Sequence, residues 1–183
     1  MHDTFQLNNA CKNDEDISPH FLGVFPADKI PSEKMKHSQT FSLIANTDPS
    51  NLPGQHWVAF MGKNGKKFFF DSYGMKPSSH FSHWREFDGW SHNVMDLQQE
   101  ESDVCGDYCI FFLKMFSSVK NPSFGRAFKS FDLDDKQEND YIVFQMCHNL
   151  YPKFLNKIAH DTDGDGHYDP LVLCKQGCIS RAK

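Results

Sequence analysis

The sequence lacks several features that would assign it to common classes of protein. Lys and Arg number 19 against 24 Asp and Glu, a net charge of -5, so the positive excess of a dominant nucleic-acid-binding surface is missing. No window approaches the roughly twenty apolar residues of a membrane span. Residues 1–18 are polar and acidic where a signal peptide has an apolar core. These absences favour a soluble protein made in a reducing compartment, with no membrane partner.

The chain also lacks internal repeats and any linker rich in Gly, Ser or Pro. Its 183 residues fit one domain that can bury a core, and phenylalanine, with 18 residues, is the compositional outlier. We expect a loosely ordered polar segment over residues 1–18 and a single domain over 19–183. The 6 cysteines, at positions 11, 105, 109, 147, 174 and 178, are expected to be mostly free thiols.

Three apolar runs predict buried strands, at residues 41–46, 56–62 and 67–71. Asn64-Gly65 between the last two runs is typical of a two-residue hairpin turn. Lys63 then faces Lys66, which places Asp71 opposite Val58 and diagonal to His56. Diagonal neighbours on one face lie roughly 7–8 Å apart at the backbone. The sequence therefore predicts a His56–Asp71 pair on one hairpin face.

Two helices are expected in the second half of the chain. Residues 105–116 are apolar on several sides, which predicts a buried helix that begins at Cys105, with Asp103 as its cap. Residues 137–160 have apolar positions near helical spacing, and Pro152 should kink or divide that helix. Strands interleaved with helices predict an α+β fold with a central mixed sheet flanked by helices.

His56, Asp71, Gln98 or Gln99, and Cys105 supply the roles that a cysteine peptidase requires. A thiol at a helix start is expected to favour the nucleophilic thiolate. The imidazole would act as base, the carboxylate would orient it, and the amide with the backbone N–H of Cys105 would hold an oxyanion. Taken singly, each of these residues is more often packing, a turn or surface. The combination carries the prediction.

The same residues lie in segments that resemble the adenovirus-type cysteine proteases (adenain), in particular their relatives in virophages and Maverick/Polinton-type elements. The matching segments are 19–25 (PHFLGVF), 44–47 (IANT), 55–60 (QHWVAF), 70–74 (FDSYG) and 98–106, within residues 19–116. The resemblance implies an adenain-like, papain-related fold with His56 as base, Asp71 as acid and Cys105 as nucleophile at the start of a buried helix. Residues 19–116 would then be the catalytic core, and 117–183 a helical, Asp/Gly-rich C-terminal part.

The resemblance leaves the oxyanion donor open between two adjacent glutamines. Gln98 lies seven residues before Cys105, as in adenain, and follows an apolar residue, Leu97. Gln99 has the spacing of six found in the related proteases that release SUMO. We favour Gln98.

The resemblance implies an endopeptidase that processes viral capsid and other virion precursors, with cleavage after small residues of the Gly-Gly type. It would act in the virion and the infected host cell, and no cofactor is required. The segment immediately before Gln98 contains no cysteine that could accept an activating peptide, and the net charge is acidic. Activation by such a peptide or by DNA is therefore not favoured. The alternatives are a deconjugating protease for a ubiquitin-like tail and a non-catalytic, calcium-stabilised binding module.

A calcium site is suggested by Asp161, Asp163, Asp165 and Asp169, whose spacing resembles the first nine positions of an EF-hand loop. Val172 stands where the bidentate glutamate is expected, so the alternative is an Asp/Gly-rich surface turn. The pairs Cys105/Cys109 and Cys174/Cys178 offer four thiols for zinc, but structural zinc sites have tighter spacings.

Overall fold

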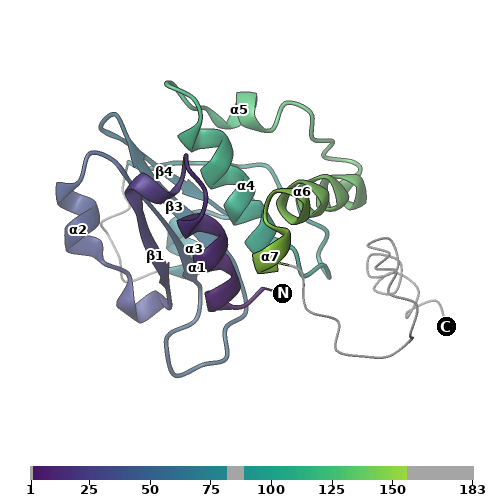
Figure 1. Cartoon of the computed structure of the whole chain (residues 1–183). Helices are drawn as coiled ribbons and strands as arrows, with labels where there is room; N and C mark the ends of the chain where they lie inside the picture. The colour runs from purple at the N-terminus through teal and green to yellow at the C-terminus, as the bar shows by residue number, and fades with distance from the viewer. Residues whose placement is uncertain (1, 82–88, 156–183) are drawn as a thin grey trace.

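A five-stranded mixed β-sheet with helices on both faces organises the computed structural model, which describes residues 2–81 and 89–155 (Figure 1). The strands lie in the order β1-β2-β3-β4-β5. The inner pairs are antiparallel, whereas β1–β2 and β4–β5 are parallel. The strand bounds are β1 Phe21–Phe25, β2 Phe41–Asn46, β3 Trp57–Lys63, β4 Lys66–Phe70 and β5 Ser91–His92. The predicted α+β class is confirmed.

The hairpin β3–β4 has the predicted turn and register. Asn64 and Gly65 have φ angles of 52° and 74°, the pair of positive values that this type of tight turn requires. Lys63 pairs with Lys66, and Ala59 with Phe70. His56 therefore lies immediately before β3 and Asp71 immediately after β4, at the same end of the sheet.

Two apolar clusters cover the two faces of the sheet, as the apolar strand sequences predict. One contains Ala59, Met61 and Phe70 from the strands and packs against α4 and α1. The other contains Val58, Phe60 and Phe69 and packs against the segments around Met35, Phe81 and Trp90. Alternate residues of β3 thus enter opposite clusters, since side chains alternate along a strand. The helix bounds are α1 Thr4–Lys12, α2 Ser32–His37, α3 Pro77–His80, α4 Cys105–Ser117, α5 Phe124–Ala127, α6 Lys136–Leu150 and α7 Pro152–Leu155.

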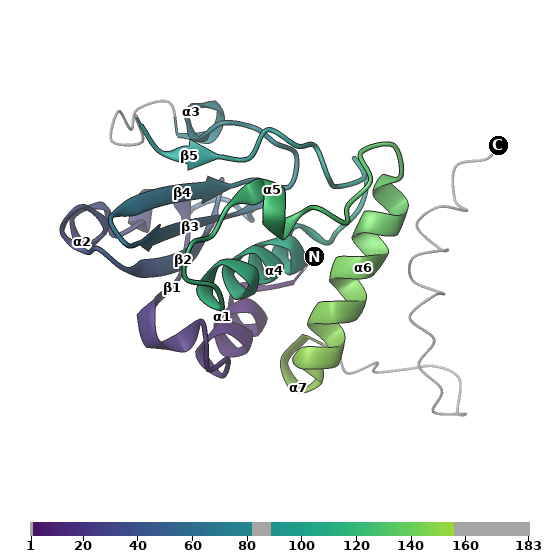
Figure 2. The same cartoon turned by 90° about the horizontal axis from the view of Figure 1, so that it is seen from above.

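Helix α4 is the central helix and begins at Cys105, as predicted. It packs against the sheet on one side, and α6 crosses its other side (Figure 2). The predicted cap is wrong, because Val104 occupies the cap position and no side chain caps the helix. Asp103 lies one residue too early to accept from the first free N–H groups of the helix.

Pro152 divides the last predicted helix, as expected. Helix α6 ends at Leu150, and α7 begins at Pro152. Proline is compatible with the first turn of a helix but not with its interior. The part of this prediction beyond residue 155 lies outside the described residues.

The expectation of a loosely ordered N-terminal segment is wrong, because residues 4–12 form α1. Asp3 and Gln6 form a capping box, in which each side chain accepts a hydrogen bond from the other residue's backbone N–H. Leu7, Ala10 and Cys11 are fully buried against the core. These three residues form a short apolar face on an otherwise polar helix. Its burial against α4 and β1 stabilises the helix. Within residues 2–81 and 89–155, no helix is long and apolar enough to span a membrane.

Candidate active site

His56 and Asp71 form the pair predicted from the hairpin. Nε2 of His56 lies 2.9 Å from Oδ1 of Asp71. The carboxylate is fully buried, and the His56 side chain is 12% exposed. With Nε2 facing the carboxylate, Nδ1 on the other edge of the ring is left for proton transfer. The Tyr73 ring covers the imidazole, with ring centroids 4.9 Å apart.

Asp71 is held ionised by three N–H donors. Oδ1 accepts from His56 and from the backbone N–H of Tyr73 at 2.8 Å, and Oδ2 accepts from Nε2 of His80 at 2.6 Å. Burial alone would raise the pKa of Asp71, but the hydrogen bonds from His56 and His80 outweigh it and lower the pKa to about 2. Asn93 fixes the backbone of Asp71 through bonds to its N–H and C=O. The site therefore contains a buried, charged and rigidly held acid.

His80 is a site residue that the sequence analysis missed. It belongs to the one-turn helix α3 and is 14% exposed. No motif marks it, because it lies nine residues after Asp71 in a segment without periodicity. Its position depends on the turn at Asp71–Gly74, where Gly74 has φ of 69° and a Cβ would lie 2.9 Å from the backbone of Met95. That close approach folds the chain back so that α3 reaches the carboxylate.

Cys105 is 2% exposed at the first position of α4. The backbone N–H groups of Trp57 and Gly106 face its sulfur and act to lower the pKa of Cys105. Trp57 directly follows His56, so the first residue of α4 lies near the end of β3 that His56 precedes.

The expectation that Cys105 favours the thiolate is not met in this structure. Burial raises the pKa of Cys105 to about 11, although the two backbone N–H groups oppose the rise. Desolvation outweighs the helix start because almost no water reaches the sulfur. The resting sulfur is therefore a thiol, and nucleophilic attack requires a base to remove its proton.

Gln98 is buried, and its amide is fixed at both ends. Ser72 Oγ donates to Oε1 of Gln98 at 2.6 Å. Nε2 donates to the backbone oxygen of Ser102 at 2.8 Å and lies 3.0 Å from its hydroxyl. Ser72 directly follows Asp71, so one dipeptide holds both the acid and the amide. To donate to an oxyanion, Nε2 must exchange a Ser102 contact for the substrate oxygen.

Gln99 occupies a different environment. Its backbone N–H faces the carboxylate of Asp140 at 3.3 Å, and its side chain is partly exposed. Burial raises the pKa of Asp140 to about 6, although hydrogen bonds from Ser102 and Tyr108 oppose the rise. Gln98 is therefore the more deeply buried residue of the two, with its amide hydrogen-bonded on both sides.

The loop before His56 is shaped by Asn46 at the end of β2. Oδ1 of Asn46 accepts from the N–H groups of Asp48 at 2.8 Å and Gln55 at 3.3 Å. Gly54 has φ of 91°, and a Cβ there would lie 2.6 Å from Nδ2 of Asn46. The positive φ and the lack of space for a Cβ both require glycine at this position. The loop ends at His56, within hydrogen-bond distance of Asp71.

Two groups of side chains among the described residues have ligand atoms close enough to hold a metal ion. One is His56, Asp71 and His80, and the other is His2, Asp107 and His148. Neither includes a cysteine. The four described cysteines, at 11, 105, 109 and 147, are free and buried. The suggested calcium residues and the Cys174/Cys178 pair lie outside the described residues.

Comparison with solved structures identifies similarity to a viral protease. No protein-family model matches the chain, and no curated protein sequence matches it. Among solved structures, the chain is similar to the ASFV pS273R protease, with 21% sequence identity and a TM-score of 0.42. The match covers 62% of this chain and 44% of the other, so the chain corresponds to less than half of that protein. A TM-score at this level does not establish a shared fold.

Proposed function

We propose that the protein is a cysteine endopeptidase in which Cys105 is the nucleophile, His56 the base and Asp71 the orienting acid. Gln98 and the backbone N–H of Cys105 donate to the oxyanion. The observation that carries the proposal is the linkage of the four residues by two dipeptides. His56-Trp57 joins Asp71 to Cys105, and Asp71-Ser72 joins His56 to Gln98.

The chemistry follows from this arrangement. Nδ1 of His56 takes the thiol proton as the sulfur attacks the peptide carbonyl, and the ionised Asp71 stabilises the imidazolium that forms. The resulting oxyanion accepts from Gln98 and the N–H of Cys105. When the tetrahedral intermediate collapses, the C–N bond breaks and His56 gives its proton to the leaving amine. His56 then deprotonates the water that hydrolyses the thioester.

The substrate is proposed to bind in the hollow beside Trp57. This hollow has a volume of about 420 Å³ and lies between the 46–54 loop and the N-terminal residues. Its lining includes Leu52 and Gly54 from the loop, and His2, Asp3 and Thr4 from the N-terminal side. An extended peptide placed there would run past the residue that follows the base.

Viral capsid and other virion precursors, cut after small residues such as Gly-Gly, are the proposed substrates. The protease would act in the virion and the infected cell, without a cofactor. The resemblance of residues 19–116 to adenain-type proteases of virophages and Maverick/Polinton-type elements motivates this assignment. The runner-up is cleavage of a ubiquitin-like conjugate, whose tail also ends in Gly-Gly.

An active-site-directed thiol probe tests the nucleophile. The wild-type chain should be labelled at Cys105, and Cys105→Ala should not be labelled, whereas Cys109→Ala should retain the label because Cys109 is fully buried. Equal labelling of wild type and Cys105→Ala would refute the assignment.

Co-expression with candidate capsid precursors, followed by mapping of new termini, tests the substrate. The control is Cys105→Ala. Precursors that remain intact while a SUMO-type conjugate is cleaved by the wild type would replace the viral substrate with the runner-up. Absence of cleavage of both substrates by a chain that the probe labels would exclude both assignments.

A further inference from the structure

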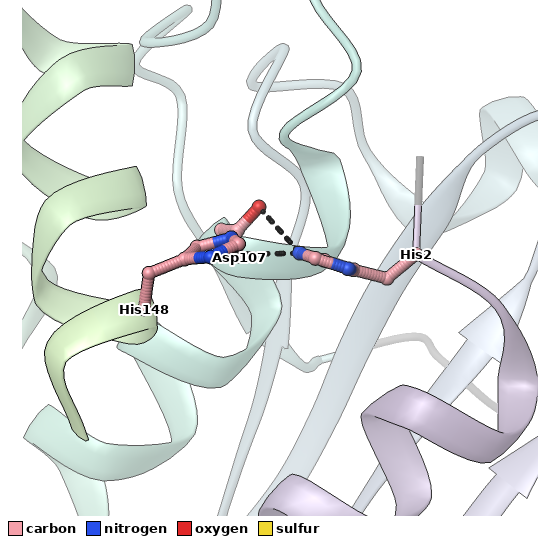
Figure 3. A group of neighbouring side chains, drawn as sticks. All are labelled: His2, Asp107 and His148. Atoms are coloured by element: carbon pink, nitrogen blue, oxygen red, sulfur yellow. Dashed lines mark hydrogen bonds and ion pairs between the residues drawn. The ribbon is translucent and has the colours of Figure 1, made fainter. Parts of the chain in front are cut away.

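A second histidine–aspartate cluster contains none of the proposed catalytic residues, although His2 also lines the hollow beside Trp57. His2 comes from the N-terminal segment, Asp107 from the first turn of α4 and His148 from the last turn of α6 (Figure 3). Nε2 of His2 lies 3.1 Å from each carboxylate oxygen of Asp107, and Nε2 of His148 lies 3.7 Å from Oδ1. Figure 3 shows both imidazoles pointing toward the carboxylate between them.

The three side chains of this cluster are buried, so bringing their polar atoms out of water costs free energy. The side chains of His2, Asp107 and His148 are 8%, 1% and 11% exposed. Nδ1 of His2 is buried and has no hydrogen-bond partner among the described residues. Nε2 of His148 lies at ion-pair distance, 3.7 Å, from Oδ1 of Asp107. Two imidazoles and one carboxylate thus converge in a buried place, where one nitrogen of His2 has lost water without gaining a hydrogen-bond partner among the described residues.

The distances fit a transition-metal ion. Imidazole nitrogens and carboxylate oxygens bind Zn²⁺ at about 2.0–2.2 Å, so tetrahedral ligand atoms lie about 3.3–3.6 Å from one another. The observed separations of 3.1 and 3.7 Å bracket that range, and all the ligand atoms of the group lie within 4.8 Å. We propose that Nε2 of His2, the Asp107 carboxylate and Nε2 of His148 bind a divalent zinc-class ion, with a fourth position open to water.

The ion would join three segments that are distant in sequence. The N-terminal residues already contact the site region, because Trp57 Nε1 donates to the backbone oxygen of His2 at 3.0 Å. The His148 ring stacks on Phe144 of the same helix, with centroids 3.9 Å apart, and Cys147 donates to the backbone oxygen of Asp107. A bound ion would therefore fix the N-terminal segment and α6 to the turn of α4 that begins with Cys105. Its role is structural, and it does not depend on the proposed protease activity.

Metal content of the full, tag-free chain tests the site. All variants should carry Cys105→Ala, which removes the proposed nucleophile as a ligand. After equilibration with Zn²⁺ and dialysis against metal-free buffer, mass spectrometry should find one zinc per chain. His148→Ala and Asp107→Asn should abolish this zinc. His80→Ala, which removes a ligand of the other group, and the exposed His20→Ala should both retain it.

Two further readouts separate metal loss from misfolding. Zn²⁺ should raise the thermal midpoint of the Cys105→Ala chain and leave that of His148→Ala unchanged, with matching circular dichroism spectra in metal-free buffer. His148→Asn, a smaller change in shape, should give the same loss of zinc. Zinc that survives His148→Asn, zinc that is lost with His80→Ala instead, or no zinc retained by Cys105→Ala would each overturn the proposal.

Discussion

Replacement of Asp71 by asparagine should expose how strongly the site depends on one buried charge. Asparagine keeps the shape of the side chain but removes its charge and turns one acceptor oxygen into a donor. In the structure both oxygens accept, Oδ1 from His56 and Tyr73 and Oδ2 from His80. At least one of these three contacts must therefore become a donor–donor clash or force a change of histidine tautomer.

The magnitude follows from the lowered pKa of Asp71. A fall from 3.8 to about 2 in the folded chain corresponds to about 2 kcal/mol of stability. Because the folded pKa lies below the unfolded one, this contribution is present above pH 3.8 and is lost as pH falls toward 2. The stability gap between wild type and Asp71→Asn should be about 2 kcal/mol at pH 7 and should close in acid. The peptidase kcat should fall by roughly 10²–10⁴-fold, as expected when the orienting acid is lost.

Urea unfolding at several pH values between 2 and 7, with peptidase kinetics at pH 7, measures both effects. Asp134→Asn is the matched control, because Asp134 is exposed and its replacement should change neither quantity. A stability gap that stays constant down to pH 2 would contradict the linkage argument. A kcat within threefold of wild type would show that Asp71 does not orient the base.

Other predictions concern the residues around Asp71. His80→Ala should lower kcat and shift the pH–rate profile, because Oδ2 of Asp71 loses its hydrogen-bond donor. His80→Gln should restore part of the rate, because its amide N–H can donate to Oδ2. An unchanged pH–rate profile would mean that His80 has only a structural role. Gln98→Ala should lower kcat by roughly 10²–10³-fold with KM little changed, whereas Gln99→Ala should be nearly silent; the reverse pattern would assign the oxyanion role to Gln99. Gly54→Ala should lower both activity and the thermal midpoint, because the new Cβ would collide with Asn46. Gly65→Ala should lower the thermal midpoint alone, because φ of 74° strains the backbone but no atom lies near the new Cβ. Alkylation of Cys105 by iodoacetamide should rise about tenfold per pH unit from pH 7 to 10, since burial raises its pKa to about 11; a plateau near pH 7 would indicate a preformed thiolate–imidazolium pair.

Local patterns predicted the elements that carry the site. Asn64-Gly65 determines the hairpin turn, and the two-residue period of the strands then places Asp71 diagonal to His56 without any distant contact. The apolar run that begins at Cys105 determines the start of α4, and Pro152 determines where the last long helix divides. These features follow from backbone geometry within a few residues, which is why a single sequence reveals them.

The tertiary structure decided everything that depends on distant segments meeting. His80 reaches Asp71 because the turn at Gly74 packs against the backbone of Met95, and Ser72 reaches Gln98 across 26 residues of sequence. The polar N-terminal sequence gave no strong helical pattern, yet α1 forms because its short apolar face is buried. His2, Asp107 and His148 have no common motif, since they belong to three segments that only the packing of α1, α4 and α6 brings together. The raised pKa of Cys105 has the same origin: the sequence places it at a helix start, but its burial is a property of the packed core.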